Sequence, residues 1–503
     1  MADTKREIER KYEGPAAEGD TGMPDLSGVP GVARVIDKGV AELDATYYDT
    51  PDQRLATASL TLRRRTGGHD AGWHLKLPVS EGVRDEIQAP LSDTVPRAIA
   101  GLVRSRVRDA ELAPLVRLRS ARDIRHLVDD SGALLAEVSL DRVRAERLGE
   151  GEGTAAWTEI EVELADDGDP AFLDKVEKKL RKAGLSRSAS SSKLAKALST
   201  TGKRAGKPAP RTDPDTAGDH VLAYLRAQYD AIVELDPAVR RDLPDSVHSM
   251  RVATRQMRGT FRSYGKILDR AVTDPIGDEL KWLAGELGVD RDQEVLTERL
   301  TESLAQLPRT LLSGPVRTRL RTWAHARHGG SRRRLIAVLD GKRYLALLTA
   351  LDALVTDPPL LKAAAGDPGK VIAKAVRKDF GKVSDLVEQA LDRPPGADRD
   401  HAMHEARKKA KRTRYAAEAA APALGAPAAG LVKSMKSLQS LLGDHQDSVM
   451  TREALRELAA LAHAAGETSF TYGVLYGREE QRAAEAEAAL PGAWEKIEAQ
   501  TAV

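Results

Sequence analysis

The 503-residue chain contains no cysteine, which excludes a disulfide scaffold, a thiolate metal site and a cysteine nucleophile. Aromatic residues make up only 4% of the sequence, while alanine, leucine and arginine abound, which favours helices over an all-β protein. Hydrophobic residues make up 41%, enough to bury sizeable cores. No apolar run approaches the roughly 18 residues of a membrane span, and residues 1–11 are charged, unlike a signal peptide. We therefore expect a soluble cytoplasmic protein of about two or three domains.

Net charge is also nearly absent, but the two signs are unevenly distributed. The chain carries 78 basic and 76 acidic residues, a formal net charge of +2. Residues 303–339 contain eight arginines and no acid, and residues 186–212 contain seven basic residues and no acid. Basic segments in a nearly neutral chain indicate local anion sites rather than a uniformly basic, nucleic-acid-type surface.

The hydrophobic pattern changes near residue 200. Before it, segments such as residues 73–77 and 159–164 alternate between two kinds of side chain, and this period of two is typical of β-strands. We expect about eight strands there, with helices near residues 93–108 and 169–184. Residues 201–214 are rich in Gly, Pro, Lys and Thr, so they are the predicted linker.

The remainder of the chain is helical in pattern and repeats itself. A histidine followed by basic residues at offsets 3, 7 and 10 occurs twice, from His248 and from His404. Each set is followed by Leu-Gly and then Asp, at residues 287–292 and 442–447. The histidine and the last aspartate are 44 residues apart in the first copy and 43 in the second. This predicts a duplicated helical unit, and an Asp-Pro pair at 274–275 predicts a helix start.

Acidic side chains alternate on two of the predicted strands. Residues 7–11 (EIERK) place two glutamates on one face, and residues 159–164 (EIEVEL) place three. If both faces line one cavity, they form a hard-oxygen site suited to Mg²⁺ or Mn²⁺; the alternative is a solvent-exposed sheet face. Cations on alternating strands would clamp a metal-bound polyphosphate. They are Arg63, Arg65, Lys76, Arg84 and Arg122.

Residues 1–200 resemble a CYTH domain of the triphosphate tunnel metalloenzyme superfamily. The resemblance rests on the E-x-E-x-K segment at 7–11 and on YYDT at 47–50, LRRR at 62–65, WHLK at 73–76, Arg122, Asp141, EIE at 159–161 and SK at 192–193, in that order. It implies an antiparallel eight-stranded barrel around a tunnel. The implied metal ligands are Glu7, Glu9, Asp141, Glu159 and Glu161. The implied phosphate contacts are Lys11, Arg63, Arg65, Lys76, Arg122 and Lys193, while Glu163 would face the tunnel without binding metal.

The resemblance also implies a reaction. The family includes inorganic, thiamine and RNA triphosphatases and adenylyl cyclases. A metal-activated water would attack the terminal phosphorus, and no side chain need act as a covalent nucleophile. Cyclase-type members carry an aromatic-containing segment before the first glutamates. Only residues 1–6 precede Glu7, so we disfavour a cyclase.

The basic residues after His248 share one face of the predicted helix. Met250, Met257 and Phe261 lie on a separate face, which suits a core. Like charges at these spacings repel one another on an isolated helix. The face therefore suits an anion. One alternative is that the histidines have a structural role, and another is that the arginines form an exposed face paired with acidic residues elsewhere.

Residues 215–500 resemble a CHAD domain, through VHSMRVATR at 247–255 and its echo HEARKK at 404–409. The resemblance implies two helical bundles, at about 215–355 and 368–500, around a basic groove that binds inorganic polyphosphate. The expected contacts are His248, Arg251, Arg255, Arg258, Arg262, His404, Arg407, Lys408, Lys411 and Arg414. Gln256 and Lys411 depart from the family pattern, in which arginine is commoner.

The sequence thus predicts a multidomain α+β protein, with a β barrel followed by an all-α duplicated bundle. It predicts metal-dependent hydrolysis of inorganic triphosphate or short polyphosphate in the barrel and polyphosphate binding by the helices. One alternative is a non-catalytic polyphosphate-binding protein that gathers at polyphosphate granules. The other is a nucleic-acid-binding protein, which the shortage of stacking aromatics disfavours. Membranes are not expected among the partners.

Overall fold

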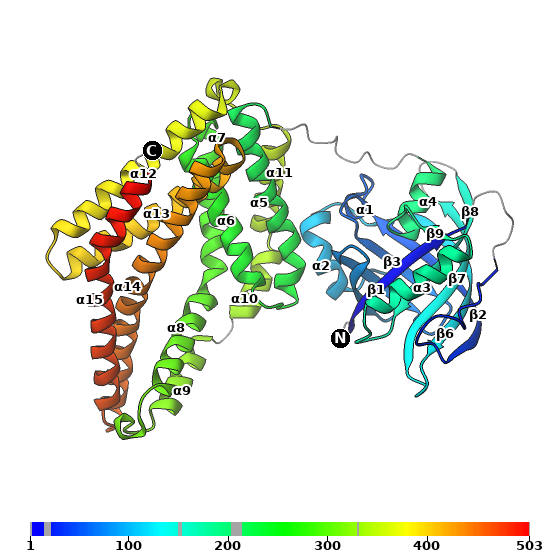
Figure 1. Ribbon diagram of the computed structural model, residues 1–503, viewed down its shortest axis with the longest axis horizontal. Helices are drawn as coiled ribbons and strands as arrows, with labels where there is room; N and C mark the ends of the chain where they lie inside the picture. Colours follow the sequence, from blue (N-terminus) through cyan, green and yellow to red (C-terminus); the bar gives the residue numbers. More distant parts are fainter. Residues whose placement is uncertain (1–2, 15–21, 149–152, 203–213, 329–330, 502–503) are drawn as a thin grey trace. The chain divides into compact units, whose positions relative to one another are not determined.

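The computed structural model describes residues 3–14, 22–148, 153–202, 214–328 and 331–501. The chain divides into two units, residues 1–211 and 212–503, and each is described by itself (Figure 1). Most of the predicted linker, residues 203–213, lies outside the described residues. No helix of the described ranges combines the length and the apolar character that crossing a bilayer requires.

The strands of the first unit close into an antiparallel barrel. They are β1 (Asp3–Glu13), β2 (Arg34–Asp49), β3 (Thr61–Thr66), β4 (Gly72–Ser80), β5 (Val83–Ala89), β6 (Ala113–Val128), β7 (Leu134–Arg147), β8 (Thr154–Leu164) and the short β9 (Ser186–Arg187). Neighbours follow the order β5-β4-β3-β2-β6-β7-β8-β1, and β1 pairs back with β5. The ring of eight strands therefore has no free edge, and β9 is added to β1. The predicted eight-stranded barrel is confirmed.

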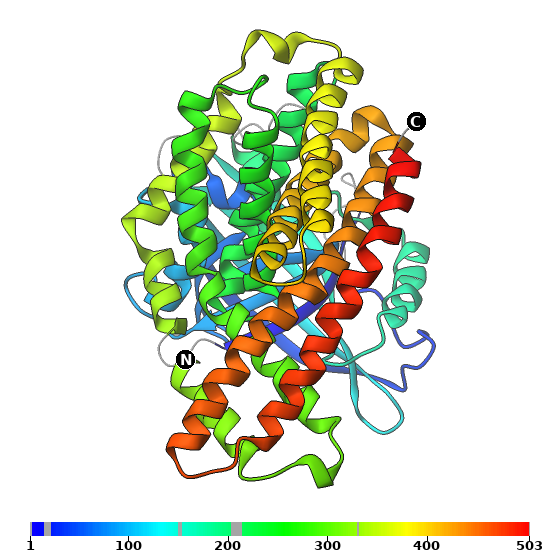
Figure 2. The same cartoon turned by 90° about the vertical axis from the view of Figure 1, so that its left-hand side faces the viewer.

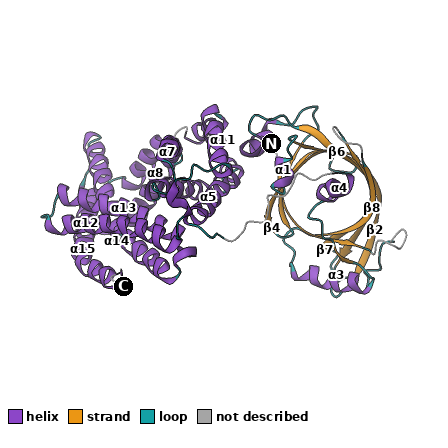
Figure 3. Ribbon diagram, turned by 90° about the horizontal axis from the view of Figure 1, so that it is seen from above, coloured by secondary structure: helices purple, strands orange, loops and turns teal. Residues whose placement is uncertain are grey.

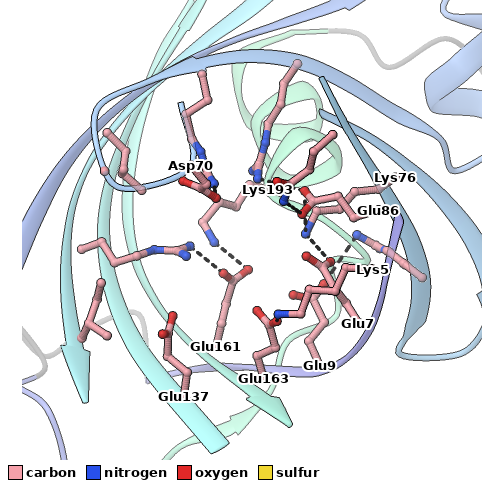
Figure 4. Close-up of a pocket in the computed structure, with 18 of the residues that line it drawn as sticks. Lys5, Glu7, Glu9, Asp70, Lys76, Glu86, Glu137, Glu161, Glu163 and Lys193 are labelled. Carbon is pink, nitrogen blue, oxygen red and sulfur yellow. Dashed lines mark hydrogen bonds and ion pairs between the residues drawn. The ribbon is translucent and has the colours of Figure 1, made fainter. Parts of the chain in front are cut away.

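The alternation on β8 explains why the barrel has a charged interior. Ile160, Val162 and Leu164 are buried against α3 (Ala171–Lys182), which covers the outer face of the barrel there. The glutamates between them point inward (Figure 4). Helix α2 (Arg97–Val107), with the short α1 (Arg54–Thr57) beside it, packs on β3, β4 and β5 through a second apolar cluster. Helices α2 and α3 confirm the two helices expected in this half.

Helix α4 (Lys193–Thr201) lies inside the ring of strands (Figure 3). Its Leu194, Ala197 and Leu198 are buried among side chains of β2, β6 and β7, including Tyr47 and Leu118. The helix therefore fills one end of the barrel with apolar contacts. The rest of the interior is left to the charged side chains.

Helices make up the second unit within its described residues, as expected, apart from loops and an isolated β-bridge between Leu268 and Leu360. Its α-helices are α5 (Ala217–Arg240), α6 (Ser246–Ser263), α7 (Arg270–Glu286), α8 (Gly288–Ala305), α9 (Val316–His328), α10 (Ser331–Asp340), α11 (Lys342–Thr356), α12 (Pro368–Asp392), α13 (Ala397–Leu424), α14 (Ala426–Ala464) and α15 (Phe470–Thr501). Two short 3-10 helices lie at Arg309–Leu311 and Lys362–Ala365.

One large core joins most of these helices, and it buries Met250, Met257 and Phe261 of α6 as expected. A separate core joins α8 and α9 to parts of α14 and α15 (Figure 2). The predicted helix start at 274–275 is wrong. Helix α7 begins at Arg270 because Asp269 caps it, accepting a hydrogen bond from the backbone of Ala271, and the proline lies inside the helix.

Candidate functional site

The barrel interior that α4 leaves open is a cavity of about 350 Å³, here called the tunnel (Figure 4). Charged side chains form most of its lining. Every cation that the sequence predicts for triphosphate is among them: Lys11, Arg63, Arg65, Lys76, Arg84, Arg122 and Lys193. Six stand at inward-facing strand positions, and Lys193 is the first residue of α4.

Three predicted metal ligands converge on one point. Asp141 on β7 stands directly across from Glu159 on β8, and Glu161 follows on the same face. One carboxylate oxygen of each lies within 4.8 Å of the other two, and all three side chains are buried. This carboxylate triad is a set of hard oxygen donors, which suits a divalent cation such as Mg²⁺ or Mn²⁺.

Glu7 and Glu9, the other two predicted ligands, line the tunnel but lie outside the triad. Lys76 Nζ donates to Glu7 Oε2 at 2.5 Å. Glu9 Oε1 lies 3.4 Å from Lys11 Nζ and 3.6 Å from Arg84 Nη1. Burial raises the pKa of Glu7 to about 7, against the attraction of Lys76. Strand β1 thus offers a second row of carboxylates, each held by a cation.

Cations also engage the triad itself. Lys193 Nζ lies within 3.0 Å of an oxygen of all three carboxylates. Arg122 donates to Asp141 and to Glu161, each at 2.8 Å, and Lys11 pairs with Glu161. The tunnel's positive and negative groups therefore form ion pairs with one another.

These contacts set the charge state of the triad. Burial opposes ionisation of Glu161, but Lys11 and Lys193 outweigh it and hold its pKa well below the ordinary value. Burial likewise opposes ionisation of Asp141, and Arg122 and Lys193 keep the pKa of that carboxyl low. Both carboxylates are charged at neutral pH, as a metal ligand must be.

Sequence analysis missed Glu86, a buried carboxylate on β5. Its Oε1 lies 3.0 Å from His74 Nδ1, 3.4 Å from Arg63 Nη2 and 3.7 Å from Lys76 Nζ. A signal was present, because Glu86 stands two residues from the predicted Arg84 and so shares its face. Glu86 holds the cations of this wall in place.

Sequence analysis also missed two polar side chains that contact the predicted arginines. Tyr47 OH accepts a hydrogen bond from Arg63 Nη1 at 3.4 Å, and Asp70 pairs with Arg65. Tyr47 belongs to a segment used for the resemblance, but no role was assigned to it. Asp70 lies in the turn between β3 and β4, where no alternation marks which side chains face inward.

The helical unit contains two adjoining basic pockets, of about 540 and 390 Å³. Arg255 of α6 and His404, Arg407 and Lys411 of α13 line both of them. Nine of the ten predicted polyphosphate contacts line one pocket or both. They are His248, Arg251, Arg255, Arg258, Arg262, His404, Arg407, Lys408 and Lys411. The duplicated basic faces thus meet where α6 crosses α13.

Arg414 is the predicted contact that lines neither pocket. Its Nη1 donates to Glu418 Oε1 at 2.5 Å, and its guanidinium lies 4.7 Å from the Tyr415 ring centre. Gln256 donates to the other oxygen of Glu418, at 3.0 Å. The basic lining residues that were missed are Arg299, Lys409 and Arg412.

In each repeat the glycine of the second motif lies against an arginine of the first. A Cβ on Gly288 would lie 2.7 Å from Arg251 Cζ, and a Cβ on Gly443 would lie 3.5 Å from Arg407 Nη2. The missing side chain of Gly288 lets Arg251 approach more closely than a Cβ would allow, whereas the distance at Gly443 is an ordinary van der Waals contact. The spacing that predicts the duplication therefore reflects a contact between the motifs.

Crowded cations change the acidity of the pockets. Burial, together with Arg255 and Arg407, lowers the pKa of Lys411 to about 8. Burial and nearby cations also lower the pKa of Lys409 and of Arg258. An anion in these pockets would relieve the repulsion, so they are suited to a polyanion.

Comparison with known proteins gives matches to both units. A family model described as the CYTH domain matches residues 5–198, and one described as the CHAD domain matches residues 223–456. Uncharacterized proteins from two strains of Mycobacterium tuberculosis are 37% identical over 510 residues, which covers 98% of this chain and 96% of theirs.

Solved structures give more distant likenesses. PptA from Streptomyces chartreusis is 22% identical with a TM-score of 0.47, and the match covers 56% of this chain and 99% of that one. The CHAD domain from the plant Ricinus communis is 22% identical with a TM-score of 0.43, and covers 59% and 95%. Likenesses this distant do not bear on function.

Proposed function

The chain belongs to the family in which a CYTH domain precedes a CHAD domain, and from that premise we propose that the barrel hydrolyses inorganic triphosphate or short polyphosphate with a divalent metal, while the helical unit binds polyphosphate. The observation that carries the proposal is the buried carboxylate triad: its Glu161 lines the same tunnel as all seven predicted phosphate contacts, and one of these, Lys193, contacts all three carboxylates.

The ion pairs of the tunnel can be exchanged for substrate without leaving a charge unpaired. The triad can release Lys193 and Arg122 to phosphate oxygens and hold a divalent cation in their place. Such a cation supplies polarisation of the phosphate and a bound water of lowered pKa. Binding of the metal frees the cations for phosphate, and binding of phosphate frees the carboxylates for the metal. Metal and triphosphate should therefore bind together more tightly than either alone.

The remaining side chains position the phosphate chain. Arg63 is held by Tyr47 and Glu86, and a guanidinium held in this way can meet phosphate oxygens in a fixed direction. Because α4 fills one end of the barrel, a phosphate chain meets a closed end at Lys193. This favours reaction at a terminal phosphate over cleavage inside a long chain.

The helical unit would take longer chains. Two adjoining basic pockets, lined by cations from both repeats, offer a continuous series of contacts to a linear polyanion. A protein that binds polyphosphate in this way should gather at polyphosphate granules. Fluorescence microscopy of the tagged protein tests this.

The direct test is phosphate release from inorganic triphosphate with saturating Mg²⁺ or Mn²⁺. Glu161→Gln removes one oxygen donor of the triad, so turnover should fall by several powers of ten while the circular dichroism spectrum is retained. Glu42→Gln is the matched control, because Glu42 is an exposed residue of β2 outside the tunnel. Equal rates in the two variants would contradict the assignment. Polyphosphate binding without phosphate release would favour a non-catalytic binding protein.

A further inference from the structure

The second unit contains a cluster that none of these roles uses. Asp400 of α13, His445 of α14 and Glu487 of α15 each offer one ligand atom, and the three atoms lie within 4.8 Å of one another. Among the described residues, only this group and the carboxylate triad have such a geometry. The cluster joins three long helices that run close together (Figures 1 and 2).

His445 is the centre of the cluster and lacks a hydrogen bond. The side chain is 1% exposed, and neither ring nitrogen makes a hydrogen bond within the described part of the chain. Its Nε2 lies 3.2 Å from Asp400 Oδ1 and 3.4 Å from Glu487 Oε1, but neither contact is aligned as a hydrogen bond. A buried polar group left in this way costs free energy, and a bound ion would remove that cost.

The separations fit a shared ion. In a tetrahedral site with bonds of about 2.0–2.1 Å, neighbouring ligand atoms stand about 3.3–3.4 Å apart. The two distances from His445 Nε2 are close to that value.

Two arginines hold the outer oxygens of the carboxylates. Arg452 Nη2 lies 3.8 Å from Asp400 Oδ2, and Arg399 Nη1 lies 3.3 Å from Glu487 Oε2. The oxygens nearest His445 are Oδ1 and Oε1, so the arginines leave these two for a shared partner. Outer partners of this kind orient ligating carboxylates in metal sites.

We propose that Asp400, His445 and Glu487 bind a divalent transition-metal ion of the Zn²⁺ type. An imidazole nitrogen with two carboxylate oxygens suits Zn²⁺ or Co²⁺, whereas Mg²⁺ prefers oxygen donors alone. The site therefore differs in metal class from the all-oxygen triad of the tunnel. It also adjoins the basic pockets, because the next residue, Gln446, contacts His404 Nδ1 through its Oε1 at 2.7 Å.

The test counts zinc ions on the full chain. Protein is dialysed to equilibrium against Zn²⁺ in excess Mg²⁺, which occupies oxygen-only sites, and bound zinc is measured by mass spectrometry. His445→Gln should bind one Zn²⁺ fewer per chain than the wild type. The matched control is His463→Gln, an exposed histidine on the same helix, which should bind as many as the wild type. Co²⁺ should give visible absorption bands that His445→Gln loses.

Thermal unfolding gives a second readout, independent of hydrolysis. At Zn²⁺ a hundredfold above its Kd, the wild-type helical transition should rise by about 5 °C. Glu487→Gln keeps the imidazole and should show a smaller rise, so the test survives if His445→Gln fails to fold. Equal zinc content in the wild type and His445→Gln, or an equal rise in Tm, would overturn the proposal and leave an imidazole between two carboxylates.

Discussion

Replacing Lys193 with methionine removes the ammonium that contacts all three carboxylates of the triad. Its Nζ lies within 3.0 Å of each of them, and the lysine and the carboxylates are buried. Removing one partner of a buried ion pair costs about 3–5 kcal/mol, because an uncompensated charge stays behind. Arg122 still donates to Asp141 and Glu161. We therefore expect the free energy of unfolding to fall by about 3 kcal/mol, near the lower end of that range.

Lys196→Met is the matched control on the same helix. Lys196 Nζ lies 2.7 Å from Glu13 Oε2, but this pair is partly exposed. Its loss should cost only about 0.2–1 kcal/mol. Hydrogen exchange of β7 and β8 peptides in the full chain separates the two variants. Protection should fall by about two powers of ten in Lys193→Met and little in the control.

A divalent metal should reverse the effect, because Lys193 competes with it for the same oxygens. In the absence of triphosphate, Lys193→Met should bind Mn²⁺ more tightly than the wild type and regain protection, while phosphate release falls. Equal loss of protection in the two lysine variants, or greater protection of the wild type by Mn²⁺, would refute the reasoning.

Three further predictions follow from the charges and a fourth from the division into two units. Since the folded-state pKa of Glu7 is raised from 4.5 to about 7, the stability of the barrel should fall as pH rises through that interval, and Glu7→Gln should flatten the change in Tm. Replacing Arg255, Arg407 and Lys411 together by alanine should lower the salt slope of polyphosphate binding, measured by fluorescence anisotropy, by about three counterions. Lys411 loses its charge near pH 8, so wild-type affinity should fall as pH rises past that value, whereas Lys411→Arg should show constant affinity. Fragments separated within residues 203–213 should each fold, one strand-rich and one helical by circular dichroism.

Each of these has a matched control or a contrary result. Arg317→Ala with Arg321→Ala removes two exposed cations of α9 outside the basic pockets, so the salt slope should barely change. An equal decrease of the salt slope in the pocket variant and in this control would mean that binding depends on diffuse electrostatics. Constant wild-type affinity across pH 8 would remove Lys411 from the site, and a steep Tm dependence retained in Glu7→Gln would remove that carboxyl from the pH effect. Two unfolded fragments would mean a shared core.

The strand pattern predicted most of the tunnel because side-chain direction follows from local alternation. Glu159, Glu161 and Glu163 alternate with apolar residues that face α3. Because successive side chains of a strand point to opposite faces, placing the apolar residues on the outer face also places the glutamates inside. Asp141 has no such pattern around it, so only the resemblance pointed to it. The register of β7 against β8 then places it across from Glu159.

Contacts between distant segments were not predictable in the same way. Sequence analysis did not predict α4, and only the closed ring of strands determines that its apolar face lies inside. Likewise the Leu-Gly segments were recognised as a repeat, whereas the packing of Gly288 on Arg251 needs the angle between two helices. The role of His445 was hidden because Asp400 and Glu487 come from other helices.

The most direct test of the central claim is a substrate panel for the full chain. Phosphate release is measured from inorganic triphosphate, long-chain polyphosphate, ATP and thiamine triphosphate, each with Mg²⁺ or Mn²⁺ and with a chelator. The account predicts metal-dependent release that is fastest with inorganic triphosphate and is abolished by Glu161→Gln. Release that persists in the chelator, or no release from triphosphate with either metal, would contradict it.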